Sequence, residues 1–209
     1  HYLRSRDGTR RVAKTMLKIR RLKESDRALM ENFWNDLSVD TLRMWQHYES
    51  VNDIFREKSH KLIGLKNSKI VVYGFLLPDD NFPDTPSLGI VTLDSERKIG
   101  VGTLMMENLE EMGKTLEYKN IFLTTFVDNI PAFSFYKKLG YKTCEIVKRQ
   151  GKDSYAMVKK VNDLSLEKKV LSKKQVFDKK RHINPSKKLN PNCVIFTSLF
   201  SLSPRNSIK

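Results

Sequence analysis

Two hydrophobic periodicities alternate along the middle of the chain, one typical of strands and the other of amphipathic helices. Short apolar or alternating runs predict strands over 17–22, 60–65, 69–77, 88–93, 121–127, 141–148 and 154–161. Apolar positions three and four residues apart predict helices over 25–37, 101–113 and 130–139, with another helix beginning at Ser38. The order β-α-α-β-β-β-α-β-α-β-β predicts an α/β (α+β) domain with a sheet of about seven strands.

Local signals place the ends of two of these helices. Ser38 is a good N-cap for the second helix, in which Leu42, Trp45 and Tyr48 are predicted to share one apolar stripe. Gly140 follows the last apolar position of the fourth helix, where a left-handed residue commonly ends a helix. The chain is therefore expected to turn at Gly140 into the final pair of strands.

The formal net charge of +15 comes entirely from the two ends of the 209-residue chain. Residues 1–22 carry eight Lys/Arg and one acid, residues 163–209 carry eleven and three, and residues 23–162 carry twenty of each sign. A strong basic excess favours binding to phosphate backbones. The charge therefore predicts nucleic-acid contacts by the two ends and says little about the middle of the chain.

Composition divides the chain into three parts. Residues 1–15 are expected to be a basic, disordered extension, residues 16–162 a folded domain, and residues 163–209 a basic, flexible tail. No apolar run approaches the roughly 20 residues of a membrane helix, and no apolar segment follows the basic first residues as in a signal peptide. Two cysteines and four histidines give no obvious metal cluster. We expect a cytoplasmic protein with neither a metal nor a membrane contact.

The junction between strand 88–93 and the helix after it carries the clearest chemical signal. Gly100 and Gly102 let the backbone approach a ligand closely, and the N–H groups of the first helical turn would point at that ligand. The helix dipole, Arg97 and Lys98 add positive charge, which suits a diphosphate. The segment lacks the Gly-Lys-Ser/Thr of a P-loop and the third small residue of a dinucleotide fingerprint. Alone, the two glycines are equally consistent with a tight turn.

A second motif lies one helix and one strand further along the chain. The two motifs read Arg97-x-x-Gly100-x-Gly102, then Asn129-x-x-Ala132-x-x-Phe135-Tyr136 followed by Leu139-Gly140-Tyr141. This spaced pair resembles motifs A and B of the GNAT acyltransferase superfamily, whose members bind acyl-CoA. The resemblance covers residues 16–162 and implies a GNAT-like acyl-CoA N-acyltransferase fold with a mixed, mostly antiparallel sheet.

The resemblance also implies roles for individual residues. The strand of motif A would splay from its neighbour, and the pantetheine arm of acetyl-CoA would pair with backbone at its end. The implied cofactor-binding residues are Thr92, Leu93, Arg97, Lys98, Ile99, Gly100, Val101, Gly102, Thr103, Asn129, Ala132, Phe135 and Tyr136. Tyr136 would protonate the leaving CoA thiolate as a general acid. Asn129 is equally suited to cap the helix that follows it.

The general base is less determined. Direct transfer to an amine needs a proton acceptor, and the LGIVTL of the predicted motif A strand offers no carboxylate. Asp84, just before that strand, and Glu49, after the second helix, are the candidates. His47 and His60 are interpreted as ordinary polar positions, and Cys144 as a packing residue.

The resemblance implies an N-acetyltransferase that moves an acetyl group from acetyl-CoA directly to a primary amine. A small-molecule acceptor is preferred over a protein, because acids at 79, 80 and 84 and near the second helix would favour a cationic amine. Two alternatives remain open, a nucleic-acid- or ribosome-associated protein that binds through its basic ends and a non-catalytic acyl-CoA-binding domain. A homodimer is also left open.

Overall fold

The structure, a computed structural model, describes residues 17–45, 47, 48 and 50–162. The predicted basic segments 1–15 and 163–209 lie outside these residues, and so does Glu49. The predictions made for these segments and for Glu49 therefore stay predictions. None of the helices in the described part of the chain is long and apolar enough to span a membrane.

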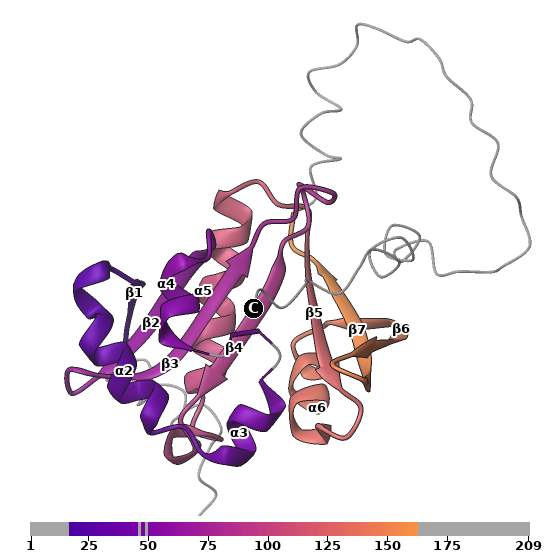
Figure 1. The fold of residues 1–209 in the computed structure, drawn as a ribbon. Coiled ribbons are helices and arrows are strands. Elements are labelled where there is room, and N and C mark those ends of the chain that lie inside the picture. Colours follow the sequence, from indigo (N-terminus) through magenta and orange to yellow (C-terminus); the bar gives the residue numbers. More distant parts are fainter. Residues whose placement is uncertain (1–16, 46, 49, 163–209) are drawn as a thin grey trace, which may run out of the picture.

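Seven strands form one open sheet in the described residues (Figure 1). The strands are β1 (Lys18–Arg21), β2 (His60–Lys66), β3 (Lys69–Leu77), β4 (Ser87–Thr92), β5 (Asn120–Phe126), β6 (Lys142–Arg149) and β7 (Lys152–Lys160). Their order across the sheet is β1-β2-β3-β4-β5-β7-β6, and every neighbouring pair is antiparallel except β4 and β5. The predicted fold class is confirmed.

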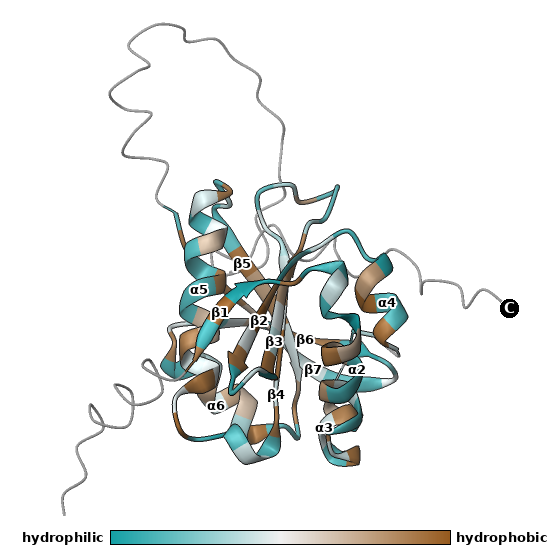
Figure 2. Cartoon of the chain, turned by 90° about the vertical axis from the view of Figure 1, so that its left-hand side faces the viewer, coloured by the Kyte–Doolittle hydropathy of each residue, from teal (hydrophilic) through white to brown (hydrophobic). Residues whose placement is uncertain are grey.

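Helices cover both faces of this sheet, as the turned view in Figure 2 shows. The helices are α2 (Arg27–Asn35), α3 (Val39–Met44), α4 (Val51–Arg56), α5 (Val101–Thr115) and α6 (Ile130–Lys138), with short 3-10 turns η1 (Glu24–Asp26) and η2 (Asp94–Glu96). One core lies between the sheet and α5 and α6, and includes Met105, Leu109 and Tyr136. A second core on the opposite face packs Met30 and Phe33 of α2 against β3. Successive side chains of a strand point to opposite faces of the sheet, so alternate residues of β3 and β4 belong to the two different cores.

The two neighbours of β4 pair with it to very different extents. The β3–β4 ladder runs over six residue pairs, from Leu77↔Ser87 to Val72↔Thr92. The parallel β4–β5 ladder has a single pair, Ser87↔Phe122, at the start of β4. The two strands diverge beyond this pair (Figure 1). The splaying that the GNAT resemblance implied is therefore present in the fold.

One helix prediction is wrong. The helix capped by Ser38 ends at Met44, so Leu42, Trp45 and Tyr48 do not share a helical stripe. Trp45 has extended backbone, and its N–H donates to the Leu42 carbonyl over 3.0 Å in a closing turn. A separate short helix, α4, begins after Ser50, whose side chain accepts from the backbone N–H of Asp53. The rings of Trp45 and Tyr48, which lie between these two helices, pack on Phe75 of β3 instead. This tertiary packing outweighs the local helix propensity of the segment.

Candidate active site

The edge of β4 that faces β5 presents unpaired backbone groups. The N–H of Phe122 donates to the Pro86 carbonyl, and the N–H of Leu93 donates to Val71 of β3, both over 3.0 Å. Because strand backbone groups alternate in direction, even-numbered residues of β4 face β5 and odd-numbered ones face β3. Ile90 and Thr92 therefore direct their N–H and C=O groups into the widening gap. Of the predicted pair, Thr92 faces this gap, whereas the Leu93 N–H is engaged with β3.

The N-terminus of α5 lies directly after this edge. Gly100 is the N-cap, with φ 95°, a left-handed conformation that suits glycine, and no side chain caps the first turn. The first hydrogen bond of this turn runs from the Leu104 N–H to the Gly100 carbonyl over 3.0 Å. The backbone N–H groups of 101–103 precede the first helical bonds and make a positively polarised anion site at the end of a 15-residue helix.

Gly102 is the point where the two sequence motifs meet. A Cβ placed on Gly102 would lie 3.5 Å from Phe135 Cζ and 3.8 Å from Thr92 Oγ1. These are ordinary contact distances, so an alanine would fit, whereas a larger side chain would extend toward the β4 edge or the Phe135 ring. The structure thus brings Thr92, the 97–103 segment and α6 together as the sequence predicted.

Arg97 is already held by neighbouring side chains. Its guanidinium pairs with Asp94 at 2.8 Å and donates to Thr41 Oγ1 at 2.6 Å, while the Thr41 hydroxyl contacts the Asp94 carboxylate at 3.1 Å. Burial opposes the charge on Asp94, but hydrogen bonds from Ser38 and Thr41 and the charge of Arg97 hold its pKa below the ordinary value. This network fixes α3 against the candidate phosphate segment, a contact that no sequence signal indicated.

Asn129 is the N-cap of α6, as its alternative interpretation as a capping residue predicted. Its Oδ1 accepts from the Ala132 N–H at 3.2 Å, and Pro131 occupies the first turn. The side-chain amide N–H groups of Asn129 are not used by the cap, so the same residue can still donate to a ligand.

Tyr136 lies in the core between the sheet and helices α5 and α6. The residue is 8% exposed, and its ring packs at centroid distances of 5.5 Å from Phe135 and 5.9 Å from Tyr141. Burial raises the pKa of the Tyr136 phenol above its ordinary value. The hydroxyl therefore stays protonated at neutral pH, as a proton donor must.

Asp84, a predicted candidate base, lies at the other end of β4. Its carboxylate pairs with Lys119 Nζ at 2.6 Å, and its backbone carbonyl accepts from the N–H groups of Lys119 and Asn120. The hydrogen bond from Lys119 lowers the pKa of Asp84. The structure does not bring this carboxylate to the open end of the gap, and its lowered pKa makes it a weaker base.

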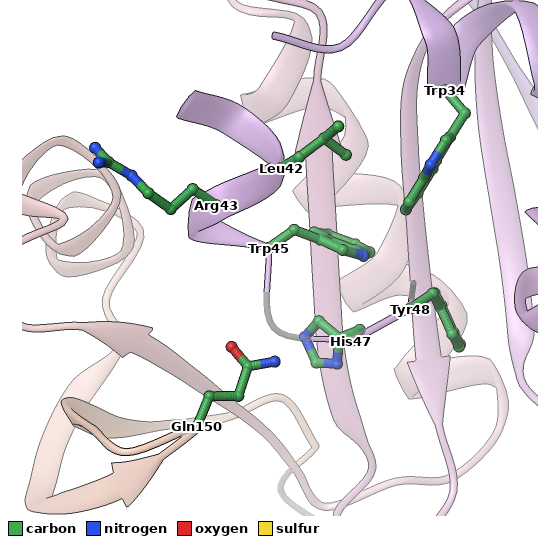
Figure 3. Close-up of a pocket in the computed structure, with 7 residues that line it drawn as sticks. All are labelled: Trp34, Leu42, Arg43, Trp45, His47, Tyr48 and Gln150. Carbon is green, nitrogen blue, oxygen red and sulfur yellow. The ribbon is translucent and has the colours of Figure 1, made fainter. Parts of the chain in front are cut away.

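A pocket of about 390 Å³ opens between α3 and the β6–β7 turn, and sequence reasoning missed it (Figure 3). Its walls are mainly aromatic, and its lining residues are Trp34, Leu42, Arg43, Trp45, His47, Tyr48 and Gln150. Figure 3 shows the Gln150 amide directed toward His47, while Arg43 extends away from it. The cluster of Trp45, His47 and Tyr48 after α3 was the available signal, but the helical interpretation of this segment concealed it.

Comparisons with known proteins agree with this fold. The family model described as "Acetyltransferase (GNAT) family" matches residues 19–141. The chain therefore belongs to the GNAT acetyltransferase family. A solved acetyltransferase of the GNAT family from Streptococcus pneumoniae superimposes with a TM-score of 0.60 at 21% identity, covering 70% of this chain and 99% of that one. At this identity the likeness shows the fold alone.

Two curated relatives are named N-alpha-acetyltransferase. The protein from Sulfolobus acidocaldarius is 33% identical over 102 residues, and that from Sulfurisphaera tokodaii is 28% identical over 102 residues. In each case the match covers 41% of this chain and 61% of the relative. The chain thus spans less than two thirds of the length of these relatives.

Proposed function

We propose that the protein transfers an acetyl group from acetyl-CoA directly to a primary amine. The observation that carries this proposal is the open β4 edge at Ile90 and Thr92, which runs into the uncapped N-terminus of α5. An extended amide-containing arm can add to such an edge as a strand would, and a diphosphate suits the helix terminus that follows. Family membership supports the same assignment.

The two motifs supply complementary parts of the cofactor site. The backbone of 97–103 binds the diphosphate, and Lys98 adds positive charge to that anion site. Thr92 pairs with the pantetheine arm from one side, and the amide of Asn129 donates to it from the other. Phe135 provides an apolar wall next to Gly102, and Ala132 packs against the same core.

Tyr136 donates a proton to the sulfur as the carbon–sulfur bond breaks. A phenol is a weaker acid than a thiol, about pKa 10 against 8.5, and burial increases that difference for Tyr136. Proton donation therefore has to accompany the development of charge on sulfur rather than precede it. Loss of such a general acid costs about 10²–10⁴-fold in rate.

The acceptor we propose is the α-amine of a peptide chain. Sequence reasoning preferred a small cationic amine held by acids, but Asp84 pairs with Lys119 and Asp53 accepts a hydrogen bond from Ser50. The described lining of the pocket contains no carboxylate to bind a polycation and includes Arg43. The names of the two curated relatives support an α-amine.

The test is a thiol-release assay with the full chain, acetyl-CoA and a panel of amines. The panel contains a short peptide with a free N-terminus, the same peptide blocked at its N-terminus with a lysine inside, and spermidine. We expect turnover of the free N-terminus at the highest kcat/KM. Exclusive turnover of spermidine would restore the small-molecule acceptor. No turnover of any amine, with tight acetyl-CoA binding, would favour the non-catalytic alternative.

A further inference from the structure

The segment between α3 and α4 carries a histidine onto the middle of the sheet. The His47 ring packs edge-to-face on Phe75 of β3, with centroids 4.9 Å apart and an interplanar angle of 89°. Trp45 lies 5.1 Å away on the same segment, and Tyr48 also packs on Phe75, at 5.1 Å. Contacts with strand β3 therefore position His47, although the residue itself belongs to the short connection between α3 and α4.

Gly89 of β4 makes room for this placement. Gly89 lies directly opposite Phe75 in the ladder, and a Cβ there would come within 2.3 Å of the Phe75 ring and 3.1 Å of His47 Cδ2. Any other residue would push the two rings off the strand. The next residue, Ile90, directs its backbone into the β4–β5 gap, so the imidazole lies one residue from the edge where a thioester would bind.

His47 and Tyr136 lie on opposite faces of the sheet. His47 contacts Phe75, which belongs to the core under α2–α4, whereas Tyr136 belongs to the core under α5 and α6. The gap between β4 and β5 is an opening in the sheet itself, so one of its sides is the face of His47 and the other is the face of Tyr136. A proton acceptor on one side and a proton donor on the other is the arrangement that amine attack and thiolate departure require.

The described lining of the pocket around His47 includes one charged side chain, that of Arg43. Arg43 of α3 and Gln150 of the β6–β7 turn line the same pocket, and Tyr48 adds a phenol 6.4 Å from the His47 ring. Strand β4 has no titratable side chain, and β3 contributes only Lys69 at its start and the buried Tyr73. Arg43 extends away from His47 (Figure 3) and pairs with Asp40 at 3.3 Å.

We propose that His47 is the catalytic base that deprotonates the acceptor ammonium, and that the pocket it lines admits the amine. This proposal rests on the proposed acetyl transfer. It gives His47 the role for which the sequence suggested Asp84 and Glu49, and it reverses the interpretation of His47 as an ordinary polar position.

The proton balance of the step is complete. His47 takes one proton from the ammonium and releases it to water. The freed nitrogen lone pair then forms a C–N bond to the thioester carbonyl, and the C–S bond breaks. Tyr136 donates its proton to sulfur and is reprotonated by the second proton lost from the nitrogen. The products are the amide, neutral CoA thiol and one proton in solution.

The experiment compares two substitutions at His47 with one at His60. His47→Phe keeps an aromatic ring against Phe75 and Trp45 but removes both nitrogens, and His47→Gln keeps hydrogen bonding without titration. His60→Gln is the matched control, because that histidine lies at the start of β2 with its ring 6.3 Å from Tyr118, outside the pocket lining. The readouts are kcat with saturating peptide as a function of pH, acetyl-CoA affinity by calorimetry, and histidine NMR titration.

We expect both His47 variants to lose about 10²-fold in kcat with unchanged acetyl-CoA affinity. In the wild type, kcat should rise with pH along the titration curve of the histidine NMR signal that is absent from the His47 variants. In the His47 variants the rise of kcat with pH should move toward the pKa of the amine itself, about 8. The His60 variant should behave as wild type.

Two outcomes would overturn the inference in different ways. If His47→Phe keeps the wild-type kcat and pH profile, His47 is a wall of the pocket, and acetyl transfer stands without it. If the wild-type protein acetylates no amine, the proposed function and the base fall together.

Discussion

The two edges of β4 differ in how far each pairs with its neighbouring strand. Toward β3 the strand is paired over six residues, and its glycine fits under an aromatic ring. Toward β5 it is paired once and then faces a gap. The paired edge holds the strand rigid, so the backbone groups of the open edge can stay in a strand conformation without a partner. An open strand edge therefore depends on the strength of the pairing on the opposite edge.

The largest effect is expected on the paired edge. Gly89→Val should lower the free energy of unfolding by about 3 kcal/mol, because the new side chain overlaps the fully buried Phe75 ring. Chemical denaturation monitored by circular dichroism measures this loss. Gly151→Val is not a matched change, since its φ is positive. Gly102→Ala, where a Cβ meets nothing closer than 3.5 Å, is the better control. A fully stable Gly89→Val protein would contradict the described packing.

The next largest effect is expected on the reaction that we propose for the open edge. The free energy of unfolding should not change. Tyr136→Phe removes the hydroxyl that we propose as the proton donor but keeps the ring between Phe135 and Tyr141. We expect kcat to fall about 10²-fold with little change in acetyl-CoA affinity. Steady-state kinetics and calorimetry together measure the two quantities. Equal kcat values for the two proteins would remove Tyr136 from the acid role.

A bulky residue at the mouth of α5 should obstruct the open edge sterically. Gly102→Trp should raise the Kd for acetyl-CoA about tenfold, equivalent to about 1.4 kcal/mol, because the side chain must lie along Thr92 or Phe135. Gly102→Ala should stay within about twofold of wild type. Calorimetric titration of both variants with acetyl-CoA distinguishes these results. Identical affinities for all three proteins would place the cofactor elsewhere.

The smallest effect is expected near the start of β4, where β4 still pairs with β5. Asp84→Asn removes a half-exposed ion pair with Lys119, which contributes about 0.5 kcal/mol. Its lowered pKa means that this contribution is present above the ordinary carboxyl pKa and is lost as the pH falls. We expect unchanged kcat at neutral pH. A large loss of kcat with normal stability would return Asp84 to the role of base.

Most of the fold followed from local patterns because the elements are long and regular. The strands 60–65 and 69–77 and the helix 101–113 each appear within a few residues of their predicted bounds. Gly140 has φ 90°, as the predicted helix end requires. These features depend on periodicity and on backbone conformation, which neighbouring residues along the chain largely decide.

The chemical site was only partly predictable, for a different reason. The glycine motif and the Asn129–Tyr136 segment are contiguous in sequence, so their spacing carried the GNAT resemblance. Arg97 donates a hydrogen bond to Thr41 of α3, and the position of His47 depends on Phe75 and Gly89. Such contacts join segments that are distant along the chain, and no local pattern encodes them.

By itself, the sequence determined the order of elements, the neutral middle between two basic ends, and the two motifs that mark the family. Only the tertiary structure decided that β4 opens toward β5, that the helix after Ser38 ends at Met44, and that an aromatic pocket with His47 lies over Gly89. The physical reason is that periodicity reports which face of each element is buried. The packing of one side chain against another depends on which elements become neighbours.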